Sequence, residues 1–281
     1  MASTLSLYQE TCTAISKTVI RKYSTSFYLS SLLFSKNIRN AIFTIYGFVR
    51  LADEIVDTFH EYDKETLFKT FETDTYLAIK HRISLNPVLH AFQKTVHEYS
   101  IDTAYIEAFF KSMQFDLHKK SYTTTHEINE YIYGSAEVVG LMCLRVFCNS
   151  NQEFEKLKQP AIKLGAAFQK VNFLRDLHND TATLQRMYFP NLLHHEFTET
   201  VKQEIITDIA NDFNEAYKGI TLLPRNSQLA VFTAFLYYKT LLNTLQQTPA
   251  QQIAHKRIRV NNIKKILLIC KAYCICKLRL L

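Results

Sequence analysis

Apolar residues recur every three to four positions along almost the whole chain. This spacing places them on one face of a helix, and no segment alternates apolar and polar residues convincingly enough for a strand. Only five glycines and five prolines occur among 281 residues, so turn signals are sparse and long helices are favoured. Helices are predicted over residues 6–24, 37–59, 64–81, 87–100, 103–119, 125–147, 153–183, 198–220, 226–247 and 261–278, with a break or kink at Pro160.

The composition agrees with one all-α domain. Hydrophobic residues make up 47% of the chain, which argues against disorder, and 281 residues are enough for a sizeable core. No long linker rich in Gly, Ser or Pro divides the sequence and no repeat is visible, so residues 1–281 are expected to form a single domain. The six cysteines include no Cys-x-x-Cys pair, which argues against a zinc site and favours reduced thiols.

Basic residues gather near the C-terminus. The formal net charge is +7, and residues 255–281 contain no acid. Nucleic acid, an anionic membrane surface or an anionic substrate would each suit this charge. Residues 266–281 form a tail of basic and apolar residues, typical of helices that lie on a membrane. With no signal peptide and no bilayer-spanning run, we expect a cytoplasmic protein, with a peripheral contact on the inner face of the membrane as an open alternative.

The first acidic stripe lies in "YGFVRLADEIVD". Arg50, Asp53 and Asp57 share one helical face, since Asp57 lies about 40° from Asp53 and about 20° from Arg50 around the helix axis. Their neighbours in the sequence, such as Phe48 and Val56, are apolar. The segment therefore predicts a core helix with a charged line along one side.

The second stripe lies in "GAAFQKVNFLRDLHND". Asn172, Asp176 and Asp180 recur every four residues and form one line on the helix. Gln169 and Arg175 lie about 60° to either side of Asn172. The intervening residues are mainly apolar, so this segment repeats the design of the first.

Aspartates within apolar helices need a partner. A solvated helix face usually carries Lys and Glu in opposite-charge pairs, and Asp is a poor residue for a helix interior. Buried carboxylates are costly unless they are paired or bind metal. Mg²⁺ suits oxygen ligands and completes its shell with water and phosphate oxygens. Two structural salt-bridge networks are the alternative. The favoured interpretation is that both stripes bind Mg²⁺ and hold a substrate with a diphosphate head and a hydrocarbon tail.

These segments resemble the squalene/phytoene synthase family, over about residues 20 to 265. The second stripe and the residues that follow it are the most specific part, because Gln, Asn, Arg, Asp and Asp all fall in register. The similar segments are "STSFYLSSLLF" (24–34), "RLADEIVD" (50–57), "MQFDL" (113–117), "YIYGSAEVVG" (131–140), "GAAFQKVNFLRDLHND" (165–180), "QRMYFP" (185–190) and "HKRIRV" (255–260).

The resemblance implies an isoprenoid synthase helical bundle with a central cavity. It also implies Mg²⁺-dependent condensation of two prenyl diphosphates, with Mn²⁺ as an alternative ion and no nucleic acid as partner. The implied metal ligands are Asp53, Asp57, Asn172, Asp176 and Asp180. The implied substrate-binding residues are Ser24, Ser26, Arg50, Gln169, Asn172, Arg175, Arg186 and Tyr188. The implied catalytic residues are Asp53, Asp57, Asp176, Asp180 and Tyr133.

Two positions depart from the family pattern. Glu54 stands where many members have Asp, and Glu137 stands in place of a usual Gly, facing either the metals or solvent. "QRMYFP" and the lack of a C-terminal membrane span look most like a bacterial phytoene synthase, which joins two geranylgeranyl diphosphates and is not expected to use NADPH. A dehydrosqualene or squalene synthase acting on two farnesyl diphosphates is the alternative within the class. A non-catalytic helical homologue that binds membranes is the alternative outside it.

Overall fold

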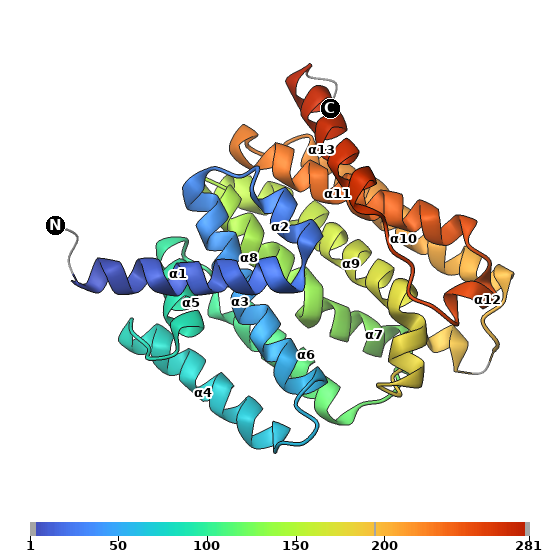
Figure 1. The fold of residues 1–281 in the computed structure, drawn as a ribbon, viewed down its shortest axis with the longest axis horizontal. Coiled ribbons are helices and arrows are strands. Elements are labelled where there is room, and N and C mark those ends of the chain that lie inside the picture. The colour runs from blue at the N-terminus through green and yellow to red at the C-terminus, as the bar shows by residue number, and fades with distance from the viewer. Residues whose placement is uncertain (1–3, 194, 279–281) are drawn as a thin grey trace.

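The protein is described here by a computed structural model that covers residues 4–193 and 195–278 (Figure 1). Residues 1–3 of the predicted domain and 279–281 of the predicted tail lie outside the described residues. The helices are α1 (Thr4–Tyr23), α2 (Thr25–Ser31), α3 (Lys36–Asp57), α4 (Lys64–His81), α5 (Pro87–Glu98), α6 (Thr103–His118), α7 (Thr125–Ile132), α8 (Val138–Phe147), α9 (Asn151–Ala182), α10 (Glu199–Ile220), α11 (Arg225–Gln247), α12 (Ala250–Ile253) and α13 (Asn262–Lys277). A π-helical turn, η1 (Tyr133–Glu137), joins α7 to α8, and a 3₁₀ turn, η2 (Pro190–Leu192), follows α9.

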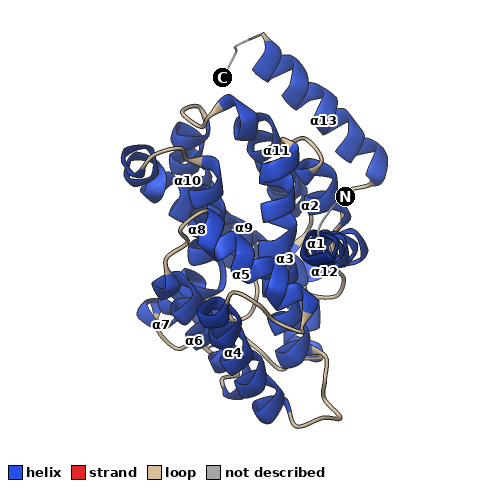
Figure 2. Ribbon diagram, turned by 90° about the vertical axis from the view of Figure 1, so that its left-hand side faces the viewer, coloured by secondary structure: helices blue, strands red, loops and turns tan. Residues whose placement is uncertain are grey.

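The all-α prediction is confirmed. Within the described residues Figure 2 shows helices and loops, and the only β-type pairing there is an isolated bridge between Ser121 and Met187. The short helices α2 and α12 were not predicted, because runs of seven and four residues are too brief for a periodic pattern. That residues 1–281 form one domain stays a prediction.

Side-chain caps explain why many helices begin where they do. Asn86 accepts hydrogen bonds from the backbone amides of Val88 and Leu89, and Pro87 occupies the first turn of α5, where its missing N–H costs nothing. Similar caps come from Ser24, Asp63, Asp102, Thr124, Ser150, Thr198 and Asn261. Short polar residues before apolar runs therefore set most of the element boundaries.

The helix α9 runs unbroken through Pro160, where a break or kink was predicted. Close packing surrounds this proline: a Cβ at Gly219 of α10 would lie only 2.2 Å from Cβ of Pro160. Nearer its middle, α9 approaches η1 just as closely, since a Cβ at Gly165 would lie 2.8 Å from the carbonyl oxygen of Ala136. Tertiary packing on both sides thus offsets the backbone hydrogen bond that proline removes.

The core fixes the two helices that carry the acidic stripes. Helix α9 packs against α8, α10 and α11, and α3 packs against α1, α5 and α8. On α3, the ring of Phe48 is fully buried and stacks on that of Phe92, with centroids 3.9 Å apart. Phe109 and Phe110 of α6 contact the same ring. The burial of these aromatic rings fixes the position of α3 in the core. The acidic stripe of α3 lies on the side of the helix that faces away from them.

Candidate active site

A cavity of about 670 Å³ lies between the helices. Its walls come from α1 to α3, α6, α7, η1 and α8 to α11. Ile42 and Ile45 of α3 and Leu157 and Leu164 of α9 line its apolar part, and all four precede the acidic stripes on their helices. The later parts of α3 and α9 supply the carboxylates. The cavity therefore has an apolar body and a charged end, which we call the mouth.

The α3 side of the mouth consists of Arg50, Asp53 and Asp57. The guanidinium of Arg50 lies 3.7 Å from the Asp53 carboxylate, pairs with Glu54, and stacks over the Tyr23 ring at 4.4 Å. The Arg50 Nε is buried without a hydrogen-bond partner. Burial, followed by the neighbouring charge of Asp57, raises the pKa of Asp53 from its ordinary value to about 7. The Asp53 carboxylate is thus crowded by negative charge.

The α9 side of the mouth repeats this arrangement with Arg175, Asp176 and Asp180. Arg175 donates from Nε to the Asp176 carboxylate at 2.9 Å, and Arg257 reaches the same carboxylate from the segment before α13 at 2.8 Å. Burial raises the pKa of Asp180 to about 7, and the charges of Asp176 and of Asp57 on α3 add to this. Because Asp57 and Asp180 influence each other, the two stripes meet at one site.

Arg186 links the mouth to α6, because it bonds to both Asp57 and Asp116. Its guanidinium donates to the Asp57 carboxylate at 2.6 Å and to the backbone carbonyl of Asp116 at 2.8 Å. Tyr131 donates to the Asp116 carboxylate at 2.7 Å, and burial raises the pKa of Asp116 to about 7. The other oxygen of that carboxylate, Oδ1, is buried without a hydrogen-bond partner. Asp116 and Tyr131 both line the cavity.

Most residues singled out from the sequence lie on the cavity wall. They are Ser24, Arg50, Asp53, Asp57, Gln169, Asn172, Arg175, Asp176, Asp180 and Tyr188. Arg186 is buried directly behind Asp57. Ser26 and Tyr133 are not among the lining residues, and the Tyr133 side chain is 40% exposed. The tyrosine of this segment that lines the cavity is Tyr131, two positions earlier.

Sequence reasoning missed several residues of the site. Asp116 lies within "MQFDL", but a single acid in one helix gave no stripe to notice. Arg257 lies within the basic segment "HKRIRV", whose contact with Asp176 joins positions 81 residues apart. Tyr238 of α11 donates to the Asn172 amide oxygen at 3.3 Å, and its ring stacks on Phe168 at 4.0 Å. Nothing in the local pattern distinguishes Tyr238 from a core aromatic.

Glu137 faces neither the mouth nor open solvent. It lies near Lys163, Lys170 and Asp212, at the contact between α9 and α10. Both lysines donate to the Asp212 carboxylate, at 2.8 and 2.6 Å. Burial raises the pKa of Glu137 to about 7, opposed by the two lysines. The acid in place of the usual Gly therefore belongs to a separate charged cluster.

Aromatic rings line the cavity just below the mouth. Phe27 of α2 lies 6.2 Å from the ring of Phe168, 5.9 Å from that of Tyr238 and 6.2 Å from that of Tyr46. All four rings are part of the wall. Their faces and edges are suited to contact with an apolar chain or with a carbocation.

The comparisons with known proteins agree with this geometry. A sequence profile described as squalene/phytoene synthase matches residues 20–264, which is most of the chain. The chain belongs to the squalene/phytoene synthase family. This confirms the resemblance seen in the motifs and, at the level of the family, the expectation of a prenyltransferase.

Relatives of this squalene/phytoene synthase family member include two chloroplastic phytoene synthases from plants. The enzyme of Daucus carota is 28% identical, in a match that covers 91% of this chain and 68% of the relative. The enzyme of Narcissus pseudonarcissus is 27% identical over 91% of this chain and 64% of the relative. The chain thus spans about two thirds of the length of these relatives.

Solved structures show the same fold. A dehydrosqualene synthase in complex with a ligand superposes with a TM-score of 0.82 at 21% identity, over 96% of this chain and 98% of that one. A squalene synthase from Alicyclobacillus acidocaldarius gives a TM-score of 0.75 at 17% identity, over 89% and 97% of the two chains. The predicted isoprenoid synthase bundle is therefore confirmed as the fold of this family member.

The family uses divalent metal, and the donor set of the mouth suits a hard cation. Four carboxylates and the Asn172 amide offer oxygen atoms. Burial, followed by the charge of neighbouring carboxylates, raises the pKa of Asp53 and of Asp180, and a cation would favour the ionised form of both. Within the described ranges no three His, Cys, Asp or Glu side chains converge on one point. Mg²⁺ sites in proteins commonly use only one or two carboxylates, with water and phosphate oxygens completing the shell.

Proposed function

We propose that this chain is a phytoene synthase, which condenses two geranylgeranyl diphosphates through a cyclopropylcarbinyl diphosphate. The observation that carries the proposal is the meeting of the two acidic stripes, with their arginines, at the mouth of an apolar cavity. That cavity suits a substrate with a charged head and a long hydrocarbon tail. The curated relatives named phytoene synthases support the C20 substrate. A cytoplasmic location belongs to the same proposal.

Asp53, Asp57, Asp176 and Asp180 would hold Mg²⁺, with Asn172 assisting. Bound there, the ions would neutralise the leaving diphosphate so that its allylic C–O bond can ionise. Arg50, Arg175 and Arg257 donate to the phosphate oxygens and so hold the head groups at the mouth. The unpartnered Nε of Arg50 is a donor of the kind that an anionic ligand would satisfy.

Residues of the cavity wall then stabilise the carbocation and accept the proton. Phe27, Phe168 and Tyr238 present ring surfaces to the allylic cation, and the apolar body excludes water that would trap it. When the second double bond attacks and the cyclopropane ring closes, one proton leaves the substrate carbon. We assign it to the phenolic oxygen of Tyr131, which passes its own proton to Oδ2 of Asp116. The Asp116 pKa of about 7 is matched to this role near neutral pH.

A dehydrosqualene or squalene synthase is the second candidate. The structural neighbours bear these names, and the family relationship does not separate C15 from C20 substrates. Both candidates use the same site. They differ in the length of the hydrocarbon chain that the cavity must hold, which is C15 for one and C20 for the other.

One assay tests both candidates. The purified protein is incubated with Mg²⁺ and either farnesyl or geranylgeranyl diphosphate, with and without NADPH, and the hydrocarbon is identified by mass spectrometry. We expect phytoene from the C20 substrate without need of NADPH. A C30 hydrocarbon alone would establish the second candidate, and no hydrocarbon from either substrate would refute the enzymatic function.

The proton relay has its own test. Tyr131→Phe is expected to lower kcat by roughly 10²-fold with little change in KM, because the proton acceptor is lost while the head-group site remains. Tyr133→Phe is the matched control, since that side chain is exposed and outside the cavity. Equal activities of the two variants would remove Tyr131 from the mechanism.

A further inference from the structure

Helix α13 exposes large apolar side chains on its outward face. Ile263 is 72% exposed, Leu267 62%, Ile266 57% and Tyr273 51%. A surface helix ordinarily turns polar residues to the solvent. In both views of the fold α13 lies at the rim of the molecule (Figures 1 and 2). No described residue of α13 lines the cavity.

Five of the exposed residues form a continuous line, and Ile266 and Tyr273 lie on one flank of it. At 100° per residue, Ile263, Leu267, Cys270, Cys274 and Leu278 fall within about 80° of one another around the helix. The opposite face packs against α11, where Ala272 is fully buried and the Lys265 ammonium lies 5.5 Å from the Tyr237 ring centroid. Apolar side chains therefore lie on both faces of the helix, which is typical of a helix whose outer face becomes covered.

Lysines flank this line. Lys264 and Lys271 lie on one flank of the outward face and Lys277 lies on the other. All three are exposed, and residues 255–278 contain no acid. An apolar strip between lysines matches the boundary between the acyl chains and the anionic head groups of a bilayer.

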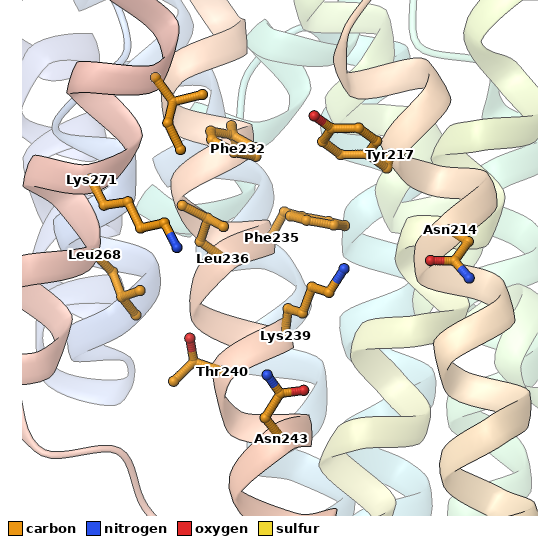
Figure 3. Close-up of a pocket in the computed structure, with 11 residues that line it drawn as sticks. Asn214, Tyr217, Phe232, Phe235, Leu236, Lys239, Thr240, Asn243, Leu268 and Lys271 are labelled. Atoms are coloured by element: carbon orange, nitrogen blue, oxygen red, sulfur yellow. The ribbon is translucent and has the colours of Figure 1, made fainter. Parts of the chain in front are cut away.

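A groove of about 420 Å³ continues this surface along the flank of α13. It lies between α13, α11 and α10, and Figure 3 shows Lys271 and Lys239 reaching into it over Leu236 and Phe235. Lys239 lies 5.5 Å from the Phe235 ring centroid. The groove thus combines apolar side chains with lysine ammonium groups, as the outward face does. Lys271 belongs to both surfaces.

We propose that the outward face of α13 and the adjoining groove form a docking surface for an anionic phospholipid bilayer. No helix of the described residues is long and apolar enough to cross a membrane, so α13 would lie flat in the interface. Contact with a second copy of α13 would place lysines near lysines, and neither helix has an acid to pair with them. Anionic lipid head groups supply the negative charge that pairs with these lysines. This property is independent of the reaction proposed above.

The absence of tryptophan from the chain allows a site-specific test. Leu267→Trp places a fluorophore on the outward face, and Leu77→Trp places one at a position of α4 that is 45% exposed. With vesicles of phosphatidylcholine and phosphatidylglycerol, the emission of the Leu267→Trp protein should shift to the blue and be quenched by brominated acyl chains. The Leu77→Trp protein should not respond.

Charge and apolar contributions are measured by vesicle flotation. Leu267→Glu should weaken binding roughly tenfold or more, and Lys264→Ala and Lys271→Ala roughly fivefold each. Leu77→Glu, Lys69→Ala and Lys80→Ala on α4 are the matched controls. No blue shift, or equal binding to vesicles of phosphatidylcholine alone, would overturn the proposal. A blue shift without vesicles that grows with protein concentration would identify a second copy as the occupant instead.

Discussion

The acidic stripes of α3 and α9 follow the same plan but are held in different ways. On α3, Asp57 is held by Arg186, which comes from a loop 129 positions later and is itself buried. On α9, Asp176 is held by its neighbour Arg175 and by the half-exposed Arg257. One stripe therefore depends on a buried arginine, and the other on the mostly buried Arg175 together with the half-exposed Arg257.

Each stripe also contains one aspartate that no strong ion pair satisfies. Asp53 has only the 3.7 Å contact with Arg50, and no ion pair is found for Asp180 among the described residues. The pKa of each is raised to about 7. We infer that in each stripe arginine orients one of the two proposed Mg²⁺ ligands, while the other has no strong partner and is the more available to a cation.

The largest expected effect comes from removing the available carboxylates. Asp53→Asn and Asp180→Asn should each lower kcat by roughly 10²- to 10³-fold, because charge stabilisation of the leaving diphosphate is lost. Folding should be intact by circular dichroism, since a crowded charge is removed without change of shape. Asp74→Asn on α4 is the control. Full activity in either variant would exclude that residue from metal binding.

Next in size is the loss of the buried anchor. Arg186→Ala should lower the free energy of unfolding by about 3 kcal/mol, because the partly buried carboxylates of Asp57 and Asp116 lose their common cation. Urea denaturation measures this change. Arg186→Lys should restore only part of it, since lysine cannot repeat the forked hydrogen bonds.

The exposed anchor should behave differently. Arg257→Ala is expected to raise KM for the prenyl diphosphate by roughly tenfold, while the unfolding free energy changes by less than about 1 kcal/mol. Steady-state kinetics and urea denaturation on one sample separate the two effects. Arg259→Ala, an exposed neighbour, serves as the control. If Arg257→Ala proved as destabilising as Arg186→Ala, the contrast between the two anchors would be wrong.

The smallest effect is a pH dependence of stability. Because folding raises the Asp53 pKa from 3.8 to about 7, the stability linked to this group is full below pH 4 and is lost as the pH rises through 7. In EDTA, Asp53→Asn should therefore gain stability over the natural protein as the pH goes from 4 to 7. Thermal unfolding checks this. Added Mg²⁺ should raise the melting temperature of the natural protein more than that of Asp53→Asn.

The all-α fold was accessible from the sequence because helical periodicity is a local pattern. Spacing alone also shows the charged lines of Asp53 and Asp57 and of Asn172, Asp176 and Asp180, and the resemblance to the family makes these lines a candidate metal site. Asp116 and Arg257 do not, since their partners lie far away in the chain and come close only after packing.

Two neighbouring tyrosines show a further limit of sequence reasoning. Tyr131 and Tyr133 are chemically identical and lie about 200° apart around a helix, so they face opposite sides. Tyr131 is buried and lines the cavity, whereas Tyr133, where the π-helical turn begins, is 40% exposed. The sequence shows that only one of the two can point inward, but which one does so depends on how the segment packs.

The ion pair between Asp57 and Arg186 also bears on the order of folding. When α3 leaves the ribosome, the arginine that will hold its last carboxylate has not yet been synthesised. Contacts between distant segments form slowly, because the intervening chain must first be closed into a loop. A nascent chain that ends before residue 186 contains both stripes but cannot complete the mouth. Comparing diphosphate binding by fragments that end before and after residue 186 would therefore show whether the site needs Arg186 to form.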